Sequence, residues 1–431
     1  MAAGETTDGV KSSGKNVVAD SEPTPLAAWW NGKSLSGDWF GAKPYVEDRG
    51  LTIQGSWAGA YFGILDSENG SGNAFSQHLT FNANLDFFKL TGSRALKGLT
   101  AFSEGRWRDP GYDANPNNEV EASSLFNPSR YVGGAGWRLM SFGLSYTTPE
   151  LFGAEDFLTL TGGWIQPQKE FVEQPLARLF VNNAMASAEG LGGNIPFGSS
   201  YSTWGGTIEV KPVVWQYTKA GLFMTFPDAT SPGNHGLMFQ GLGSDPSQNG
   251  LFFMGETGVT PEIGASKLPG RYAFGGYFYG DNTAQTGTDR YAFYWQADQM
   301  LFREASTDPD RPSPQGLRVF SLFTLAPNER GITYPFYMQG GLVYEGPIPG
   351  RDRDQLIVGT AFGRYSDQTR QNADAKGNPG PETTTLIEAG YRIKLNGWSF
   401  VQPFAQYIVQ PNGTTAVADA AILGVFLGVD F

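Results

Sequence analysis

The chain has 431 residues, of which 58 are glycine, 14% are aromatic and only 17% are charged. Its formal net charge of −12 argues against nucleic acid as a partner, because nucleic-acid-binding proteins need a basic groove. No apolar run approaches the roughly 20 residues of a membrane-spanning helix, so only a closed sheet can carry this chain across a membrane. The lack of cysteine fits such a sheet, in which every backbone group is paired, but it is not specific.

The N-terminal residues carry no strand periodicity. Residues 1–28 are small, polar and charged, which predicts a disordered tail. No signal peptide is visible, so we expect one to have been removed before Met1. Residues 29–50 predict a short periplasmic helix, because Ser36 or Asp38 can cap it and Gly50 can end it.

From residue 51 to residue 431 the dominant period is two. In residues 77–88, Phe81 and Leu85 lie on an apolar face, and Thr80 and Asn82 lie on a polar one. No helix alternates in this way. The segment predicts an all-β fold, a transmembrane antiparallel β-barrel of sixteen strands that leaves an aqueous channel. The predicted strands begin near residues 51, 76, 97, 137, 156, 203, 216, 250, 269, 290, 316, 334, 353, 383, 398 and 420.

The connections between these strands alternate in length. If the N-terminus is periplasmic, three connections on the external side are long, at residues 109–136, 167–202 and 227–249. Most periplasmic ones are short, with residues 304–315 as the main exception. Short periplasmic turns and long external loops are typical of outer-membrane barrels, and a soluble sandwich has no reason for them.

Residues 423–431 carry the clearest strand signature. Counting back by two from the terminal Phe431 gives only apolar residues, which predict a lipid-facing stripe: Val429, Leu427, Val425, Leu423 and Ala421. The opposite face, with Gly424, Gly428 and Asp430, predicts a small lumen surface that obstructs little. The stripe resembles the C-terminal signal that the barrel assembly machinery of the outer membrane reads.

Several segments resemble, in order and spacing, the carbohydrate-selective porins of the OprB type. They are residues 35–43 (Leu-Ser-Gly-Asp-Trp-Phe-Gly-Ala-Lys), 297–303, 341–354, 388–392 and 401–408. Phe404 departs from the pattern, since the family more often has a polar residue there. The resemblance implies diffusion of mono- and small oligosaccharides through a monomeric or homotrimeric pore in the outer membrane, surrounded by lipid and lipopolysaccharide.

Charged and amide side chains in alternating strands predict the lumen wall, because Arg or Lys facing lipid at mid-bilayer costs about 2–4 kcal/mol. The candidates for pore lining and constriction are Glu104, Arg106, Arg108, Glu209, Lys211, Lys219, Glu256, Glu388, Arg392, Gln402 and Gln406. Glu104, Arg106 and Arg108 rank first, since they stack along one strand before a long external loop. The alternative for each residue is a solvated wall position or a structural ion pair.

The loop of residues 168–202 mixes apolar and polar residues, which favours folding into the barrel over capping its mouth. Residues 176–188 predict a short helix within it. Aromatic residues near strand ends predict interface girdles rather than sugar platforms: Trp57, Tyr61, Trp164, Tyr277, Trp295 and Tyr407.

Other functions stay open at this point. A general porin without sugar selectivity has the same strand pattern, as has a barrel with a plugged lumen. A β-rich glycoside hydrolase or lectin needs paired carboxylates, and Glu104, Glu256 and Glu388 form no evident pair. His78 and His235 lack the spacing of metal ligands. We therefore expect no enzyme activity, cofactor or metal.

Overall fold

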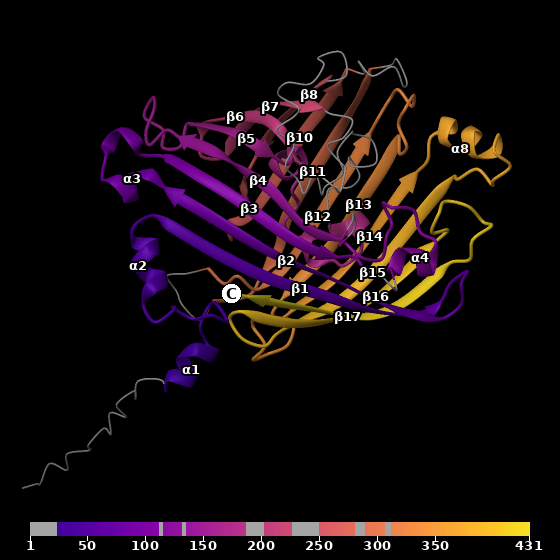
Figure 1. Cartoon of the computed structure of the whole chain (residues 1–431), viewed down its shortest axis with the longest axis horizontal. Helices are drawn as coiled ribbons and strands as arrows, with labels where there is room; N and C mark the ends of the chain where they lie inside the picture. The colour runs from indigo at the N-terminus through magenta and orange to yellow at the C-terminus, as the bar shows by residue number, and fades with distance from the viewer. Residues whose placement is uncertain are drawn as a thin grey trace, which may run out of the picture.

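The computed structural model describes residues 24–111, 115–131, 135–186, 202–225, 250–280, 289–306 and 312–431. They form a closed antiparallel β-barrel (Figure 1). Its first strand, β1 (Leu51–Asp66), pairs with the last, β17 (Ala420–Asp430), and no free sheet edge is left between them. The predicted sixteen-stranded barrel is confirmed, with the two-residue β9 (Glu262–Ile263) as an additional pairing beside β10.

The strands start close to the predicted positions. The remaining strands are β2 (Gly72–Asp86), β3 (Leu99–Asp109), β4 (Gly136–Thr147), β5 (Leu158–Ile165), β6 (Thr203–Val213), β7 (Gln216–Thr225), β8 (Gly250–Val259), β10 (Leu268–Tyr279), β11 (Arg290–Arg303), β12 (Gly316–Leu325), β13 (Phe336–Glu345), β14 (Gln355–Arg364), β15 (Thr383–Lys394) and β16 (Ser399–Val409). In β2 the alternation holds: Phe81 lies on the exposed outer face, and Ser76 and Thr80 are buried inside.

The closing strand, β17, is apolar on both faces. Leu423 and Val425 are exposed on the outer face, as the stripe predicts. The prediction of a small inner face was wrong, because Ile422 and Phe426 are buried inside the barrel. The Phe426 ring meets the Phe400 ring of β16, with 5.3 Å between their centroids. Gly424 and Gly428 on this face make room for the rings of Phe404 and Phe400, so they do not leave the lumen open.

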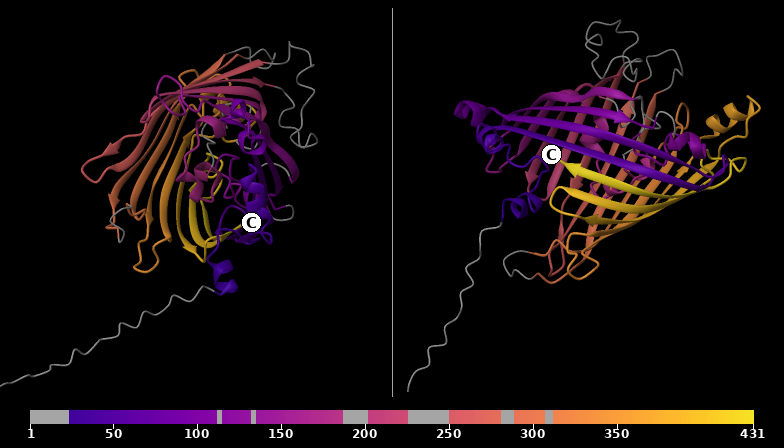
Figure 2. Two further views of the ribbon diagram at one scale, coloured as in Figure 1. Left: turned by 90° about the vertical axis from the view of Figure 1, so that its left-hand side faces the viewer. Right: turned by 60° about the horizontal axis from the view of Figure 1, so that its bottom comes forward.

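The long connections lie at one end of the barrel and the short turns at the other (Figures 1 and 2). We call residues 110–135, between β3 and β4, loop L2, and residues 166–202, between β5 and β6, loop L3. L2 contains α4 (Pro116–Val120), and L3 contains α5 (Pro167–Phe171), the 3₁₀ turn η2 (Ala177–Leu179) and α6 (Asn183–Ala186). The helix predicted at residues 176–188 is therefore broken into two short pieces over its described part.

The N-terminal helices lie at the end with the short turns, beside the C-terminus (Figure 1). They are α1 (Pro25–Trp30) and α2 (Ala42–Asp48). The Leu35 amide donates to the Asp430 carbonyl, and the Trp29 ring packs on Trp398 of the turn between β15 and β16. The predicted disordered tail lies outside the described residues up to residue 23, and α1 begins two residues later.

The other short helices occur in turns. They are α3 (Phe87–Thr91) and η1 (Arg94–Leu96) between β2 and β3, and α8 (Asp367–Asp374) between β14 and β15. In the part of the chain that the structure describes, no helix combines the length and the apolar character needed to cross a membrane.

Candidate functional site

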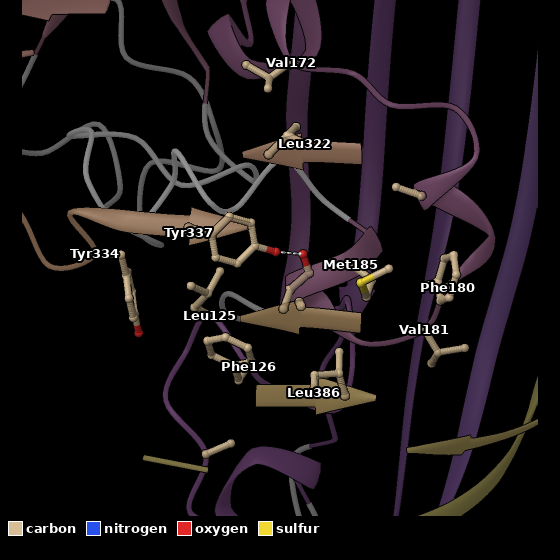
Figure 3. Close-up of a cluster of buried hydrophobic side chains, with 14 of the residues drawn as sticks. Leu125, Phe126, Val172, Phe180, Val181, Met185, Leu322, Tyr334, Tyr337 and Leu386 are labelled. Carbon is tan, nitrogen blue, oxygen red and sulfur yellow. Dashed lines mark hydrogen bonds between the residues drawn. The ribbon is translucent and has the colours of Figure 1, made fainter. Parts of the chain in front are cut away.

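Loops L2 and L3 turn into the barrel and build an apolar core inside it (Figure 3). Phe180 and Phe126 are fully buried among side chains of the inner wall, where Phe180 packs edge-on against Phe320 at 5.7 Å. The Tyr337 hydroxyl donates to the Ala184 carbonyl of α6, as the dashed line in Figure 3 marks. This core fills the part of the lumen that faces β12 to β15, which supports the prediction that L3 folds inward.

A buried carboxylate on β15 holds the backbone of L3. The Glu388 oxygens accept hydrogen bonds from the amides of Val181 and Asn182, at 2.7 and 2.9 Å, and from Gln406 at 3.3 Å. Glu388 is fully buried. Backbone amides buried without an acceptor cost about 1–3 kcal/mol each, so this carboxylate fixes the loop at that point.

Two neighbouring side chains hold the same loop two residues earlier. The Leu179 carbonyl accepts hydrogen bonds from Arg392 at 3.2 Å and Gln402 at 3.0 Å. Arg392 also donates to the Gln402 side-chain oxygen and lies over the Phe400 ring at 4.1 Å. These predicted pore residues therefore act in the structure as contacts between wall and loop.

A second group of side chains, on β7, β10 and β11, holds the start of L3. Lys219 donates to the Glu170 carbonyl, Arg271 to the Glu173 carbonyl and Gln296 to the Phe171 carbonyl. The buried Glu256 carboxylate orients this group. It accepts four hydrogen bonds of 2.6–3.3 Å, from Arg271, Gln296, Tyr217 and Tyr294. The wall thus binds L3 at both ends of its described inner stretch.

Loop L2 lies against L3 through backbone and side-chain hydrogen bonds, among which those of Arg130 are the most numerous. The Arg130 guanidinium donates to the carbonyls of Arg178 and Phe180 at 2.6 and 3.2 Å, and its amide donates to the Val181 carbonyl. Burial lowers the pKa of Arg130 from its ordinary value, but arginine stays cationic in proteins at neutral pH. Burial also raises the pKa of the adjacent Tyr131 hydroxyl to about 12, so this phenol stays protonated.

On the side of β1 to β5 the lumen stays open in two cavities. The outer chamber, of roughly 330 Å³, reaches from His78 and Arg108 near the long-loop end across to Gln339 on β13. The inner chamber, of roughly 500 Å³, lies toward the short-turn end and is lined mainly by amide and hydroxyl side chains such as Asn84, Thr100 and Ser145.

Four residues line both chambers and so mark the zone where they meet: Asn82, Glu104, Gln166 and Lys169. The Glu104 carboxylate pairs with Arg106 at 2.6 Å on its own strand and with Lys169 of L3 at 2.8 Å. It is 4% exposed. We call this junction of β3 with the start of L3 the narrow zone.

A β-bulge in the neighbouring strand β4 fixes the start of L3 beside this zone. Glu104 pairs with Ser141 and Gly105 pairs with Leu139, so Met140 of β4 is the extra residue of the bulge and is skipped in the pairing with β3. Its carbonyl accepts from the Gln166 side chain at 3.5 Å and from the Ser202 hydroxyl. Both ends of L3 are thereby tied to the wall at one point.

The eleven predicted lumen residues fall into three groups. Glu104, Arg106 and Arg108 line the outer chamber. Glu256, Glu388, Arg392, Gln402 and Gln406 contact the loops or the network that holds them, and line neither chamber. Glu209 pairs with Lys211 and Lys219 at 3.0 and 3.1 Å, and these three residues line neither chamber, although Lys219 also binds the Glu170 carbonyl of L3.

The sequence did not single out several residues that line the chambers. Lys169, Gln166, Arg130 and Tyr131 lie on L2 or L3, where no period tells which side chain faces the bore. The clustering of cations around an otherwise apolar loop was the only signal. The girdle prediction was wrong for Trp164 and Tyr277, which are buried at 2% and 4% exposure; Tyr61 and Tyr407 are exposed.

The family model for carbohydrate-selective porins of the OprB family matches residues 71–431, which is most of the chain. This chain belongs to the OprB family of carbohydrate-selective porins. It is therefore an outer-membrane channel for carbohydrates and not an enzyme.

Relatives support the same fold. Porin B of Pseudomonas aeruginosa is 22% identical, over 92% of this chain and 90% of that protein. The high-pH structure of Pseudomonas putida OprB superposes with a TM-score of 0.79 at 21% identity, covering 94% of this chain and all of that one. The low-pH structure of the same protein gives 0.58 at 18% identity, over 93% and 99% of the two chains.

Proposed function

We propose that sugars cross this chain through the narrow zone, between β3 and the start of L3. The observation that carries the proposal is the pairing of Glu104 with Arg106 and Lys169 where the two chambers meet. Because L2 and L3 fill the opposite side of the lumen, a solute that moves from one chamber to the other has to pass these side chains.

The chemistry of this zone suits a polyhydroxylated solute. A sugar that sheds water needs donors and acceptors on the wall, and they must hold it weakly enough for release. Lys169 and Arg106 donate, Glu104 accepts, and the Asn82 amide does both. The inner chamber continues this surface with hydroxyl and amide groups. The expected solutes are mono- and small oligosaccharides.

The proposal also assigns the rest of the chain. Residues 51–431 form the barrel, and residues 29–50 form a periplasmic segment beside its mouth, supported by the packing of Trp29 on Trp398. The exposed outer residues Leu423 and Val425 suit contact with outer-membrane lipid. The final strand serves as the signal for the barrel assembly machinery.

The test compares two carboxylates that each bridge two cations. Glu104→Gln removes the bridge in the narrow zone, and Glu209→Gln removes a similar bridge whose residues line neither chamber. In proteoliposomes we expect Glu104→Gln to change glucose flux by about threefold or more, since a charge at contact distance changes the barrier by the order of 1 kcal/mol. Glu209→Gln should leave the flux close to that of the unmodified chain.

Two outcomes would contradict the proposal. If the two variants change the glucose flux equally, Glu104 does not form the constriction. A planar-bilayer current that passes ions freely but does not respond to glucose or maltose would leave a general porin without a sugar path. Heat-modifiable mobility on gels checks that both variants are folded.

A further inference from the structure

The turn between β2 and β3, residues 87–98, is cationic, although the whole chain carries a net charge of −12. It contains Lys89, Arg94 and Lys97 and no acidic residue. The carboxylate of Asp86, just before the turn, caps α3 by accepting hydrogen bonds from two backbone amides at 2.9 and 3.0 Å. Even with Asp86 counted, three basic residues against one acidic residue leave a formal excess of two positive charges.

Other connections at the same end of the barrel lack this charge. Residues 148–157, between β4 and β5, hold three acidic residues and no basic one. Residues 260–267 and 346–354 carry equal numbers of acidic and basic residues, and residues 395–398 carry no charged residue. The positive charge is therefore a property of the β2–β3 turn and not of the whole rim.

The three cations of this turn are exposed. Their side chains take part in none of the ion pairs or side-chain hydrogen bonds found among the described residues. Residues 29–50 lie beside the turn (Figure 1), and their three basic and three acidic residues balance each other. The charge of the turn is thus available to a ligand.

Hydrogen bonds at both ends hold the turn in a defined shape. Gly92 ends α3 in the left-handed conformation, with φ at 71°, and its amide donates to the Phe88 carbonyl at 2.8 Å. At the other end, the Thr147 amide of β4 donates to the Gly98 carbonyl at 2.9 Å. Because the backbone is already ordered, a ligand that binds here loses little free energy to ordering the turn.

The turn continues the lipid-facing surface of the barrel. Leu144 and Tyr146 of β4 are exposed on the outer face, and Tyr146 pairs with Leu99 at the start of β3. A tyrosine at the edge of an apolar band marks the level of the lipid headgroups. Lys97 lies two residues before Leu99, and the exposed Leu90 belongs to the same turn. The cations therefore lie at the depth of the lipid phosphates.

We propose that this turn binds the headgroup of an anionic phospholipid in the periplasmic leaflet of the outer membrane. Short turns face the periplasm in barrels of this class. Lys89, Arg94 and Lys97 bind the phosphate oxygens, since basic residues near a membrane surface attract anionic lipids. Leu90 contacts the acyl chains, which a free phosphate ion lacks. The inference rests on the outer-membrane barrel and not on the sugar path.

The test is native mass spectrometry of the full chain in detergent, with dioleoyl phosphatidylglycerol as the anionic lipid and dioleoyl phosphatidylethanolamine as the zwitterionic one. We expect phosphatidylglycerol to bind severalfold more tightly. Equal binding of the two lipids would overturn the proposal. Displacement of phosphatidylglycerol by an equal concentration of inorganic phosphate would overturn the lipid assignment, because the phosphate group alone would then be recognised.

A matched pair of double variants separates this turn from the net charge of the chain. Lys89→Gln with Arg94→Gln removes one lysine and one arginine from the turn. Lys267→Gln with Arg353→Gln removes the same two charges from exposed positions in the balanced turns at this end. We expect the first pair to weaken phosphatidylglycerol binding about tenfold and the second pair to change it by less than about twofold. Equal losses in the two pairs would overturn the site.

A third variant tests the acyl contact while the charge is kept. Leu90→Ser should weaken binding of dioleoyl phosphatidylglycerol more than binding of the short-chain dihexanoyl form, because less apolar surface is buried against the chains. An equal change for the two lipids would contradict the contact of Leu90 with the acyl chains. Heat-modifiable mobility on gels shows that each variant is folded.

Discussion

The two sides of this lumen use similar inward-facing side chains for different purposes. Beside β1 to β5, Glu104 and its neighbours face two open chambers. Beside β12 to β16, Glu388 and Gln402 face the backbone of L3 and bind it. Both sides show polar residues at alternate positions of a strand.

The difference lies in what covers each wall. L3 leaves β5 through α5 and crosses the lumen, so its apolar residues reach the aromatic wall opposite its root (Figure 3). Within the described part of L3, it is the start of the loop that lies beside the wall next to its root, where the two chambers are found. Loops L2 and L3 thus leave the lumen with a packed side and a side that holds the two chambers.

The largest effect is expected from removing the carboxylate that holds L3. Glu388→Ala leaves the amides of Val181 and Asn182 buried without their acceptor, a loss of about 1–3 kcal/mol for each. The loop should then leave its position for part of the time. We expect single-channel conductance to rise and become noisy, and the effect of added sugar on the current to fall.

An exposed carboxylate on the same end of the barrel provides the control. Glu382 lies just before β15 and is exposed, so Glu382→Ala should leave conductance unchanged. A quiet channel of normal conductance in Glu388→Ala would show that the packed half holds L3 without this carboxylate.

A smaller effect is expected from crowding the packed half. A Cβ on Gly359 of β14 would lie 2.6 Å from the Met185 Cε and 2.7 Å from the Phe180 ring. Gly359→Ala therefore has to push α6 and its neighbours toward the bore, and overpacking of this kind costs about 1–3 kcal/mol. We expect a moderate fall in conductance and in the temperature at which the folded gel band is lost.

Gly105→Ala is the matching change in the other half. A Cβ on Gly105 of β3 has no atom within 4 Å among the described residues, so the variant should behave like the unmodified chain. If both glycine variants lower conductance equally, the packing of L3 on β14 is not what sets the bore.

The barrel was predictable from sequence because a strand's alternation is a local property. Phe81 and Thr80 fall on the expected faces, and the sixteen strands start close to the expected positions. The stripe on β17 was also read correctly on its outer side. Its inner side was misjudged, since Ile422 and Phe426 alternate in step with Gly424 and Gly428 and fill the inner face beside these glycines.

The site was only partly predictable, for a related reason. Alternation tells that Glu104 and Glu388 both point inward, but it does not tell which wall a distant loop covers. Lys169 and Arg130 reach the lumen from loops with no period, and their partners are more than 40 residues away along the chain. A rule that reads one strand at a time cannot find such pairs.

The division of the lumen is tested most directly by the access of a water-soluble reagent to single cysteines, because the natural chain has none. Ser56→Cys on β1 lines the outer chamber, and Ala361→Cys on β14 lies buried under L3; both changes are small. With a negatively charged methanethiosulfonate added to a planar bilayer, we predict that the current through Ser56→Cys falls promptly while that through Ala361→Cys persists. Equal rates of block at the two positions would contradict the account.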